Sequence, residues 1–515
     1  MKLFQKQSSN MPEDKLENVL EQTLFVVPGT DTKISWADSL EGILITGATG
    51  SGKSSGPGKH IALSMLKAGY SFCVLCVKPD EKDRWVNYAK QTGREQDLVI
   101  FNKASPYTFN FLQYEMQRTG DGAGDIYNTN NALMNLNEVS RQFQTGGAGN
   151  NEERYWDNSL RRLISRTIAL LVLTDEEVSL YNMRRIVADS LVEEEVSYYE
   201  KLIQTSQTKS KIDPNLKIQA QEELEDWFNS SYFLQVINKI PELSKGNETL
   251  NDEIILVRDY WLKDFARLSD RTRSIVVESY MGIIEPFMNN GILKQKFSHH
   301  LSEDIIPENI IHNNKIIILD WPVKEYGLSG TFASVIYKSA FQGALERRRV
   351  SEESNPRPSC LWTDEYQSLC NPMSDSQFQA TARSAWVSTV NITQNINSLF
   401  YMMGGNEPRS KAKSLLGNLN FKIFASNADY ETNKWASEMI GQKMTTLDNV
   451  SISKDMELSK SKNQRLLPQV MPQEFTQLRS GRNANNYLVE CIVFKAGKTW
   501  GKSKLNYALV EFSQQ

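Results

Sequence analysis

The chain has 515 residues, of which 40% are hydrophobic and 23% charged, and its formal net charge is −4 at pH 7. This composition is typical of a globular protein with room for two to four domains of about 150 residues each. The negative net charge excludes a uniformly basic nucleic-acid-binding surface, although a ring or channel can still concentrate basic residues on one inner face.

The N-terminal residues 1–24 are predicted to form a tail. The first residues lack the apolar core of a signal peptide. No stretch of the chain approaches the roughly 20 apolar residues that are needed to span a bilayer. We therefore expect a cytoplasmic protein without an intrinsic membrane span, which partners could hold at the inner face of the membrane. The five scattered cysteines indicate no disulfide framework.

The most informative motif is the segment 47–54, which fits the phosphate-binding pattern G-x-x-x-x-G-K-[ST]. An apolar strand is predicted before it at 42–46, and a helix after it at 54–68. In this context Lys53 can reach the β- and γ-phosphates of ATP, and the Ser54 hydroxyl can bind Mg²⁺. The residues predicted to hold the phosphates are Gly47, Thr49, Gly50, Ser51, Gly52, Lys53, Ser54 and Ser55.

Strands and helices alternate in two separated blocks of the sequence. The first block, 25–120, adds predicted strands at 72–77 and 98–101 to the P-loop strand and helix. The second block, 301–515, is predicted to hold strands at 315–320, 360–362, 387–393 and 421–425 and helices at 331–348 and 377–385. Such alternation predicts an α/β fold with a mostly parallel central sheet covered by helices.

The residues between the two blocks, 121–300, show helical patterns and few strand signals. We predict an all-α domain inserted into the nucleotide-binding domain. Its expected helices cover 154–173, 198–203, 224–240, 254–268 and 274–287. The charged, Gln-rich segment 206–225 is compatible with either a solvated helix or a mobile loop.

A P-loop ATPase also needs acidic groups at the end of a neighbouring strand. Asp364 and Glu365 follow the apolar residues 360–362, and we assign Asp364 to Mg²⁺ and Glu365 to the general base. Two alternatives stay open: the pair caps the next helix, or Asp320, which also ends a predicted strand, is the metal residue. Gln394 follows another strand and is the candidate γ-phosphate sensor. Arg383 is a candidate for completing a neighbouring subunit's site, with a surface salt bridge as its alternative.

Together these segments resemble the coupling ATPases of type IV secretion and conjugation (TraG/TraD-like), within the FtsK/HerA superfamily. The P-loop at 47–56, the element at 363–366, and Arg383 followed by Gln394 resemble that family's motifs, and so do 153–163 in the insertion and 467–481 near the C-terminus. Two departures stand out. The first is that family members usually begin with a transmembrane region, for which this sequence shows no candidate stretch. The second lies at residues 76–80, where the family's acidic residue before Pro and Lys is missing and Asp80 is a candidate substitute.

The resemblance implies a RecA-like motor that assembles as a homo-hexamer, hydrolyses ATP and threads DNA through a central channel, with relaxase, transfer-complex or secretion-channel proteins as partners. Single-stranded DNA is the expected cargo, and the strand preference is left open. Two alternative functions remain: a HerA-like hexameric ATPase in DNA processing, packaging or antiviral defence, and a nucleotide-gated protein-recruitment ATPase.

Overall fold

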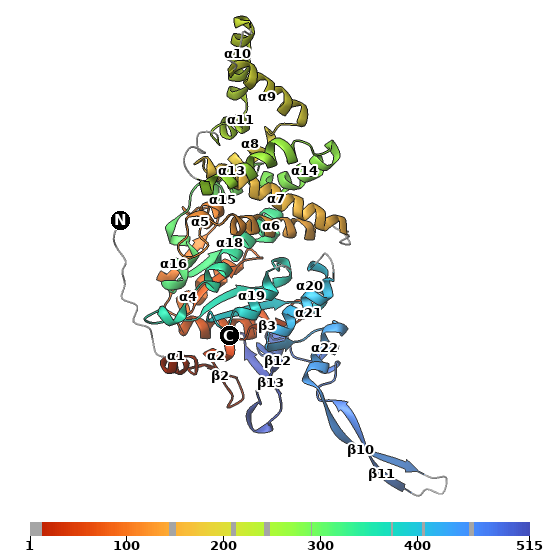
Figure 1. The fold of residues 1–515 in the computed structure, drawn as a ribbon. Helices are drawn as coiled ribbons and strands as arrows, with labels where there is room; N and C mark the ends of the chain where they lie inside the picture. Colours follow the sequence, from red (N-terminus) through yellow and green to blue (C-terminus); the bar gives the residue numbers. More distant parts are fainter. Residues whose placement is uncertain are drawn as a thin grey trace. The chain divides into compact units, whose positions relative to one another are not determined.

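The computed structural model describes residues 13–143, 151–207, 213–240, 248–289, 291–371, 374–403, 407–452 and 458–515. The chain divides into two compact units, one formed by residues 1–105 with 307–515 and the other by residues 106–306. The first unit therefore consists of two segments that are far apart in the sequence. In Figure 1 the first of these segments is coloured red to orange and the second green-teal to blue.

A nine-stranded sheet forms the centre of the first unit, in the order β13-β12-β9-β3-β8-β7-β4-β6-β5. The pairings from β9 to β5 are parallel, whereas β12 pairs antiparallel with both β9 and β13. The prediction of a mostly parallel sheet is thus confirmed. The strands are β3 (Ile43–Thr46), β4 (Ser71–Leu75), β5 (Leu98–Phe101), β6 (Ile316–Leu319), β7 (Ser359–Thr363), β8 (Val387–Thr393), β9 (Phe421–Ala425), β12 (Leu488–Lys495) and β13 (Tyr507–Ser513).

Helices cover both faces of this sheet. Ile43 and Ile45 of β3 belong to the core that contains the buried side chains of α3 (Lys59–Lys67) and α4 (Glu81–Gln91). Leu44 belongs to the opposite core, with α20 (Ile396–Met402) and α21 (Pro408–Asn418). This division follows from the strand period of two, which sends successive side chains to opposite faces. Burial on both faces explains why these strands are continuous apolar runs.

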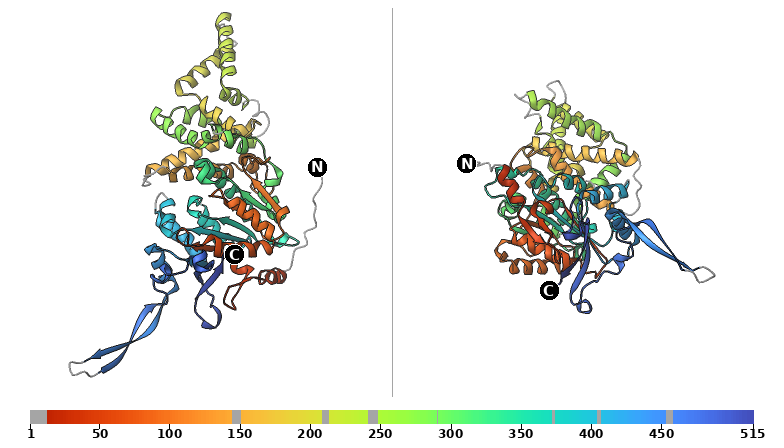
Figure 2. Two further views of the ribbon diagram at one scale, coloured as in Figure 1. Left: turned by 180° about the vertical axis from the view of Figure 1, so that it is seen from behind. Right: turned by 90° about the horizontal axis from the view of Figure 1, so that it is seen from below.

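Other elements complete the first unit. A small antiparallel pair is formed by β1 (Thr23–Val26) and β2 (Lys33–Ser35). The further helices of this unit are α1 (Glu13–Leu20), α2 (Trp36–Ser39), α16 (Pro307–His312), α17 (Val323–Tyr326), α18 (Leu328–Glu346), α19 (Asp375–Thr381) and α22 (Tyr430–Ile440). The sequence did not predict a long hairpin of β10 (Gln442–Ile452) with β11 (Leu458–Pro468), which the views in Figure 2 also show.

The second unit is helical, and its described residues hold no strand beyond one isolated bridge. Its helices are α5 (Phe111–Gln117), α6 (Ile126–Phe143), α7 (Asn151–Leu173), α8 (Leu180–Ala188), α9 (Glu193–Gln207), α10 (Pro214–Ser230), α11 (Tyr232–Ile237), α13 (Glu248–Asp259), α14 (Asp270–Asn289) and α15 (Gly291–Phe297). This unit includes residues 106–120, because Phe111 of α5 packs against Phe287 of α14.

Two segments of this unit illustrate how the structure departs from or adds to the helices predicted from the sequence. The helix expected over 224–240 is interrupted at Ser231, whose hydroxyl accepts a hydrogen bond from Leu234 N and so begins the new helix α11. Serine is a favoured N-cap, and its extended backbone stops α10. The sequence left the segment 206–225 open between a helix and a loop. The structure shows a helix from Pro214 onward, and residues 208–212 lie outside the described residues.

Candidate active site at the P-loop edge of the sheet

The P-loop connects β3 to the first turn of the following helix. Gly50 and Gly52 have φ angles of 79° and 84°, which side-chain-bearing residues rarely adopt. A Cβ on Gly52 would also lie 2.5 Å from Val489 Cγ2. The loop conformation therefore requires glycine at both positions, and it leaves the Lys53 side chain buried at the start of the helix.

The first turn after Lys53 is wider than the predicted α-helix. Residues Ser54–Gly58 form a π-type turn, in which Gly58 N donates to Lys53 O at 3.0 Å, and α3 follows from Lys59. Pro57 has no N–H and cannot donate a hydrogen bond inside this turn. The turn positions Ser54 directly beyond the buried lysine.

The strand order brings the two halves of the predicted site to one edge. Strand β8 lies between β3 and β7, and all three run parallel, so their C-terminal ends share that edge. Asp364 and Glu365 follow β7, and Gln394 follows β8. The gap from β3 to β7 is two strand spacings, about 10 Å. A phosphate chain on the P-loop can therefore lie close to both carboxylates.

Glu365 is held by three side chains from different segments. Its Oε1 accepts a hydrogen bond from Lys78 Nζ at 2.7 Å, while its Oε2 accepts from Gln367 Nε2 at 2.5 Å and from Gln394 Nε2 at 3.2 Å. Burial opposes ionisation of this carboxyl, but the Lys78 hydrogen bond and charge outweigh it, so the pKa of Glu365 lies below its usual value. Glu365 also has a left-handed backbone, with φ at 59°. The structure thus presents an ionised, oriented carboxylate.

Asp364 is buried beside it and has fewer partners. Its Oδ1 accepts from Glu365 N at 3.0 Å, and its Oδ2 lies 3.5 Å from Arg84 Nη1. The rival residue Asp320 follows β6, which lies four strands from β3, and its Oδ2 accepts from Asn102 Nδ2 at 2.9 Å. The sheet order therefore favours Asp364 over Asp320 as the acidic group that faces the P-loop.

Several unpartnered polar groups suit the site to a phosphate chain with Mg²⁺. The hydroxyls of Thr46 at the end of β3, Ser51 in the P-loop and Thr363 at the end of β7 are buried, and they have no hydrogen-bond partner among the residues that the structure describes. Burial lowers the pKa of Lys53, and the charges of Glu365 and Asp364 oppose this effect. Since Mg²⁺ commonly uses one or two carboxylates together with substrate phosphates, the Ser54 hydroxyl and Asp364 fit such an ion.

Arg383 lies away from this chain's own phosphate site. It occupies the turn between α19 and the beginning of β8, and its side chain is exposed. The seven residues of β8 separate it from the edge where Gln394 lies, which corresponds to roughly 20 Å. Of the predicted site residues, the structure therefore brings Gln394 to Glu365 and leaves Arg383 on the surface.

Comparisons with known proteins agree with this architecture. A family model described as the TraM recognition site of TraD and TraG matches residues 358–480. The conjugative coupling protein TrwBdeltaN70 in its unbound form is similar, with a TM-score of 0.58 and 15% identity over 98% of this chain and 91% of that one. The chain has the fold of a conjugative coupling protein. The resemblance and the RecA-like fold class predicted from the sequence are thus confirmed.

Further TrwB structures share the coupling-protein fold. The complex of TrwB with ADP and Mg²⁺ has a TM-score of 0.54 and 14% identity over 98% of this chain and 92% of that one. The complex with a non-hydrolysable ATP analogue has a TM-score of 0.57 and 15% identity over 98% and 93%. A search of curated proteins finds no sequence match. In the described parts of the chain, helices long and apolar enough for membrane crossing are absent.

Several residues around this P-loop were not predicted from the sequence. Lys78, Glu81 and Arg84 follow β4, which is the neighbour of β7, so the charged run at 78–84 was the signal that could have identified them. The C-terminal residues gave no such signal. Gln514 Nε2 donates to Ser55 Oγ at 2.6 Å, and a Cβ on Gly50 would lie 2.6 Å from Arg482 Nη2.

Proposed function

We propose that this protein is an ATP-hydrolysing DNA translocase that acts as a coupling protein in conjugative or type IV secretion transfer. One observation carries the proposal: the P-loop, Asp364, Glu365 and Gln394 meet at one edge of a sheet with the coupling-protein fold. TrwB, which shares that fold, is described as a plasmid coupling protein and has been solved with ADP and Mg²⁺.

In this proposal each side chain has a distinct role. Lys53 and the P-loop amides bind the phosphates, and Ser54 and Asp364 hold Mg²⁺, which would neutralise charge on them. Glu365 takes a proton from the attacking water, for which its ionised state is suited. Gln394 donates to Glu365 and is placed to respond when a γ-phosphate arrives.

The oligomer and the partners belong to the same proposal. We assign Arg383 to the site of a neighbouring subunit in a ring, which its exposure on the surface supports. DNA would pass through that ring. The match over residues 358–480 supports a contact between this part of the chain and a protein of the transfer complex.

The test measures ATP hydrolysis without DNA, with single-stranded DNA and with double-stranded DNA, alongside particle mass under each condition. We expect DNA to stimulate hydrolysis and to favour a multimeric ring. Hydrolysis that is indifferent to both DNAs, by a particle that stays monomeric throughout, contradicts the translocase proposal. Stimulation by one DNA form identifies the cargo.

A further inference from the structure

A buried carboxylate organises the loop that follows the proposed general base. This carboxylate belongs to Asp375, the first residue of α19. Its Oδ2 accepts hydrogen bonds from the Tyr366 hydroxyl at 2.6 Å and from Asn371 N at 2.8 Å. Since Tyr366 directly follows Glu365, one side chain holds both ends of the loop formed by residues 366–371.

Helix α18 supplies the charge that balances this carboxylate. Lys338 Nζ lies 2.8 Å from Asp375 Oδ2 and also donates to Leu369 O at 2.7 Å, within the same loop. Gln342, one turn further along α18, donates to Asp375 Oδ1 at 3.1 Å. The side chains of Lys338 and Asp375 are only 1% and 5% exposed. Burial removes the hydration of both charges, so stability alone gives little reason to keep the pair in place of apolar side chains.

The loop acts on Glu365 through the backbone and through Gln367. Glu365 has a φ angle of 59°, and its carbonyl oxygen accepts from Ser368 N at 2.9 Å. Gln367 Nε2 donates to Glu365 Oε2, and Gln367 Oε1 accepts from Thr393 Oγ1 at 2.8 Å. A residue with a side chain keeps such a strained backbone only where its surroundings enforce it. The loop that Asp375 holds therefore sets both the backbone and one side-chain partner of Glu365.

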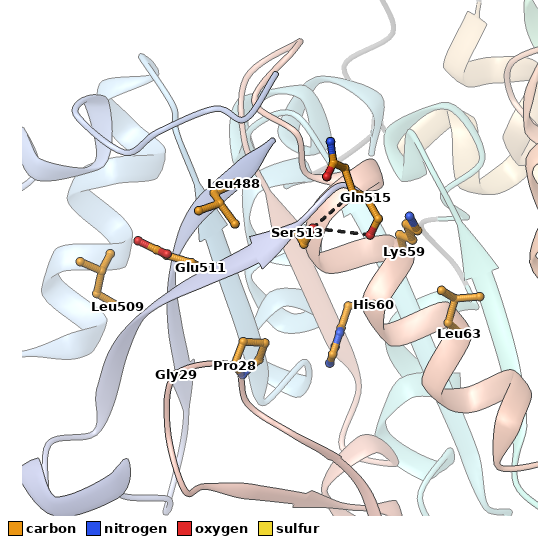
Figure 3. A pocket seen from close by; sticks show the side chains of 10 residues that line it. All are labelled: Pro28, Gly29, Lys59, His60, Leu63, Leu488, Leu509, Glu511, Ser513 and Gln515. Carbon is orange, nitrogen blue, oxygen red and sulfur yellow. Dashed lines mark hydrogen bonds between the residues drawn. The ribbon is translucent and has the colours of Figure 1, made fainter. Parts of the chain in front are cut away.

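The two faces of the sheet differ beside the P-loop. On the face covered by α3, a cavity of about 520 Å³ opens between that helix and β13, with Lys59 and Leu509 in its lining (Figure 3). On the opposite face, the Tyr366 ring packs with Leu44 of β3 in a closed hydrophobic core. Because Tyr366 and Asp375 are buried on that closed side, any effect that they have on the site is transmitted by neighbouring residues.

We propose that Asp375 is a positioning residue for ATP hydrolysis, which holds Glu365 in its working orientation through Tyr366 and the loop 366–371. The inference rests on the proposed ATPase function. Asp375 acts without touching the nucleotide, and its ion pair with Lys338 fixes it against a helix outside the phosphate site. Loss of this support should slow the chemical step and leave nucleotide binding unchanged, because the P-loop itself stays intact.

The experiment removes one hydroxyl from a ring that stays in place. Tyr366→Phe deletes the donor to Asp375. Tyr70→Phe is the matched control, because Tyr70 is fully buried, its hydroxyl lies 3.1 Å from Ser39 Oγ, and it precedes β4 at the edge of the sheet opposite to the phosphates. The double variant Lys338→Met with Asp375→Leu removes both buried charges together, so that neither is left unpaired. For each full-length variant, kcat, melting temperature and affinity for Mg²⁺ with a non-hydrolysable ATP analogue are measured.

A double-mutant cycle with Glu365→Gln separates positioning from a general loss of structure. If Tyr366 acts through Glu365, its hydroxyl has nothing left to position once the carboxylate is gone. The residual kcat of the combined variant should then match that of Glu365→Gln within about twofold. A hydroxyl with a purely structural role would lower kcat by the same factor in both backgrounds.

We expect Tyr366→Phe and the double variant to lower kcat at least about tenfold, since a misplacement of about 1 Å can cost about 10²-fold. Affinity for the analogue should stay within about twofold. Tyr70→Phe should lower the melting temperature about as much as Tyr366→Phe and leave kcat unchanged. A folded Tyr366→Phe with the wild-type kcat, or equal losses in both backgrounds of the cycle, overturns the positioning role while the ATPase function stands. A wild type that hydrolyses no ATP overturns both.

Discussion

Lys78 Nζ lies 2.7 Å from Glu365 Oε1, so an ion pair joins the loop after β4 to the loop after β7 across 287 residues of sequence. The Glu365 side chain is only 7% exposed, and that of Lys78 is 33% exposed. The lysine keeps the carboxylate ionised and points one of its oxygens toward β4. The other carboxylate oxygen accepts from Gln367 and from Gln394, and Gln394 directly follows the strand beside the P-loop strand.

Replacing Lys78 should change the pH dependence of hydrolysis. The hydrogen bond and charge of Lys78 lower the pKa of Glu365, so Lys78→Met should raise that pKa. A general base works when deprotonated, and the acidic limb of the kcat/KM profile should therefore move to higher pH. Lys82→Met is the control, because Lys82 contacts Asp83 and Asp320 instead of Glu365. An unmoved limb, or an equal shift in the control, would contradict the assignment.

Glu365→Gln and Lys53→Ala should separate hydrolysis from binding. Removing the base should lower kcat about 10²- to 10⁴-fold and leave ATP bound, because the phosphate loop is intact. Lys53→Ala should lose both, since the buried lysine is the cation of the P-loop. Hydrolysis rates and nucleotide retention on the purified protein measure the two effects. Lys67→Ala, on the exposed side of the same helix, should behave as wild type. Normal turnover by Glu365→Gln would show that another group is the base.

Replacing Asp364 or Asp320 by asparagine should have different effects on the Mg²⁺ concentration that hydrolysis requires. Asp364→Asn should raise the Mg²⁺ concentration for half-maximal hydrolysis by about 10- to 100-fold, the range for a residue that acts on a metal through its ligands. Asp320→Asn should leave that concentration unchanged, because Asp320 lies four strands from the P-loop strand and is bonded to Asn102. A Mg²⁺ titration of both variants decides between the residues, and a shift in Asp320→Asn alone would reverse the assignment.

Arg383 should act in a neighbouring subunit. Arg383→Ala alone should lower hydrolysis strongly, since an arginine finger contributes about 10³- to 10⁵-fold. Mixing Arg383→Ala with Glu365→Gln subunits should restore part of the activity, because some interfaces then combine an intact Arg383 with an intact Glu365. Arg349→Ala, another exposed arginine of the same unit, is the control. If no mixing ratio recovers activity, Arg383 has no role across the interface.

Glu81 should make the stability of the protein pH-dependent. Burial and the charge of Asp364 raise the pKa of Glu81 from 4.5 to about 8. The folded protein therefore keeps a proton there that the unfolded chain releases, and stability falls as the pH rises from about 4.5 to about 8. Glu81→Gln should flatten this fall, which melting temperatures at pH 5 and pH 8 will measure. Glu95→Gln, at an exposed position, should leave the fall as in wild type, and an equal fall in both variants would contradict the prediction.

The sequence by itself determined the features that depend on local chemistry. The P-loop was readable because glycine alone tolerates its positive φ angles, and the parallel strands because burial on both faces demands continuous apolar runs. Asp364, Glu365 and Gln394 were found because each follows such a run. The π-type turn at Ser54–Gly58 and the break at Ser231 also have local causes, Pro57 and an N-cap serine, which periodicity alone does not detect.

Only the tertiary structure decided which strand ends lie side by side at the edge of the sheet. The order of the strands in a sheet is set by packing between distant segments, so the local periodicity of the sequence does not predict it. That order places the end of β7, with Asp364, closer to the P-loop strand than the end of β6, with Asp320, and it brings Lys78 to Glu365. It also placed the end of β13 beside the P-loop helix, where Gln514 bonds Ser55 across 459 residues. The sequence thus identified the phosphate loop, and the fold supplied the side chains that surround it.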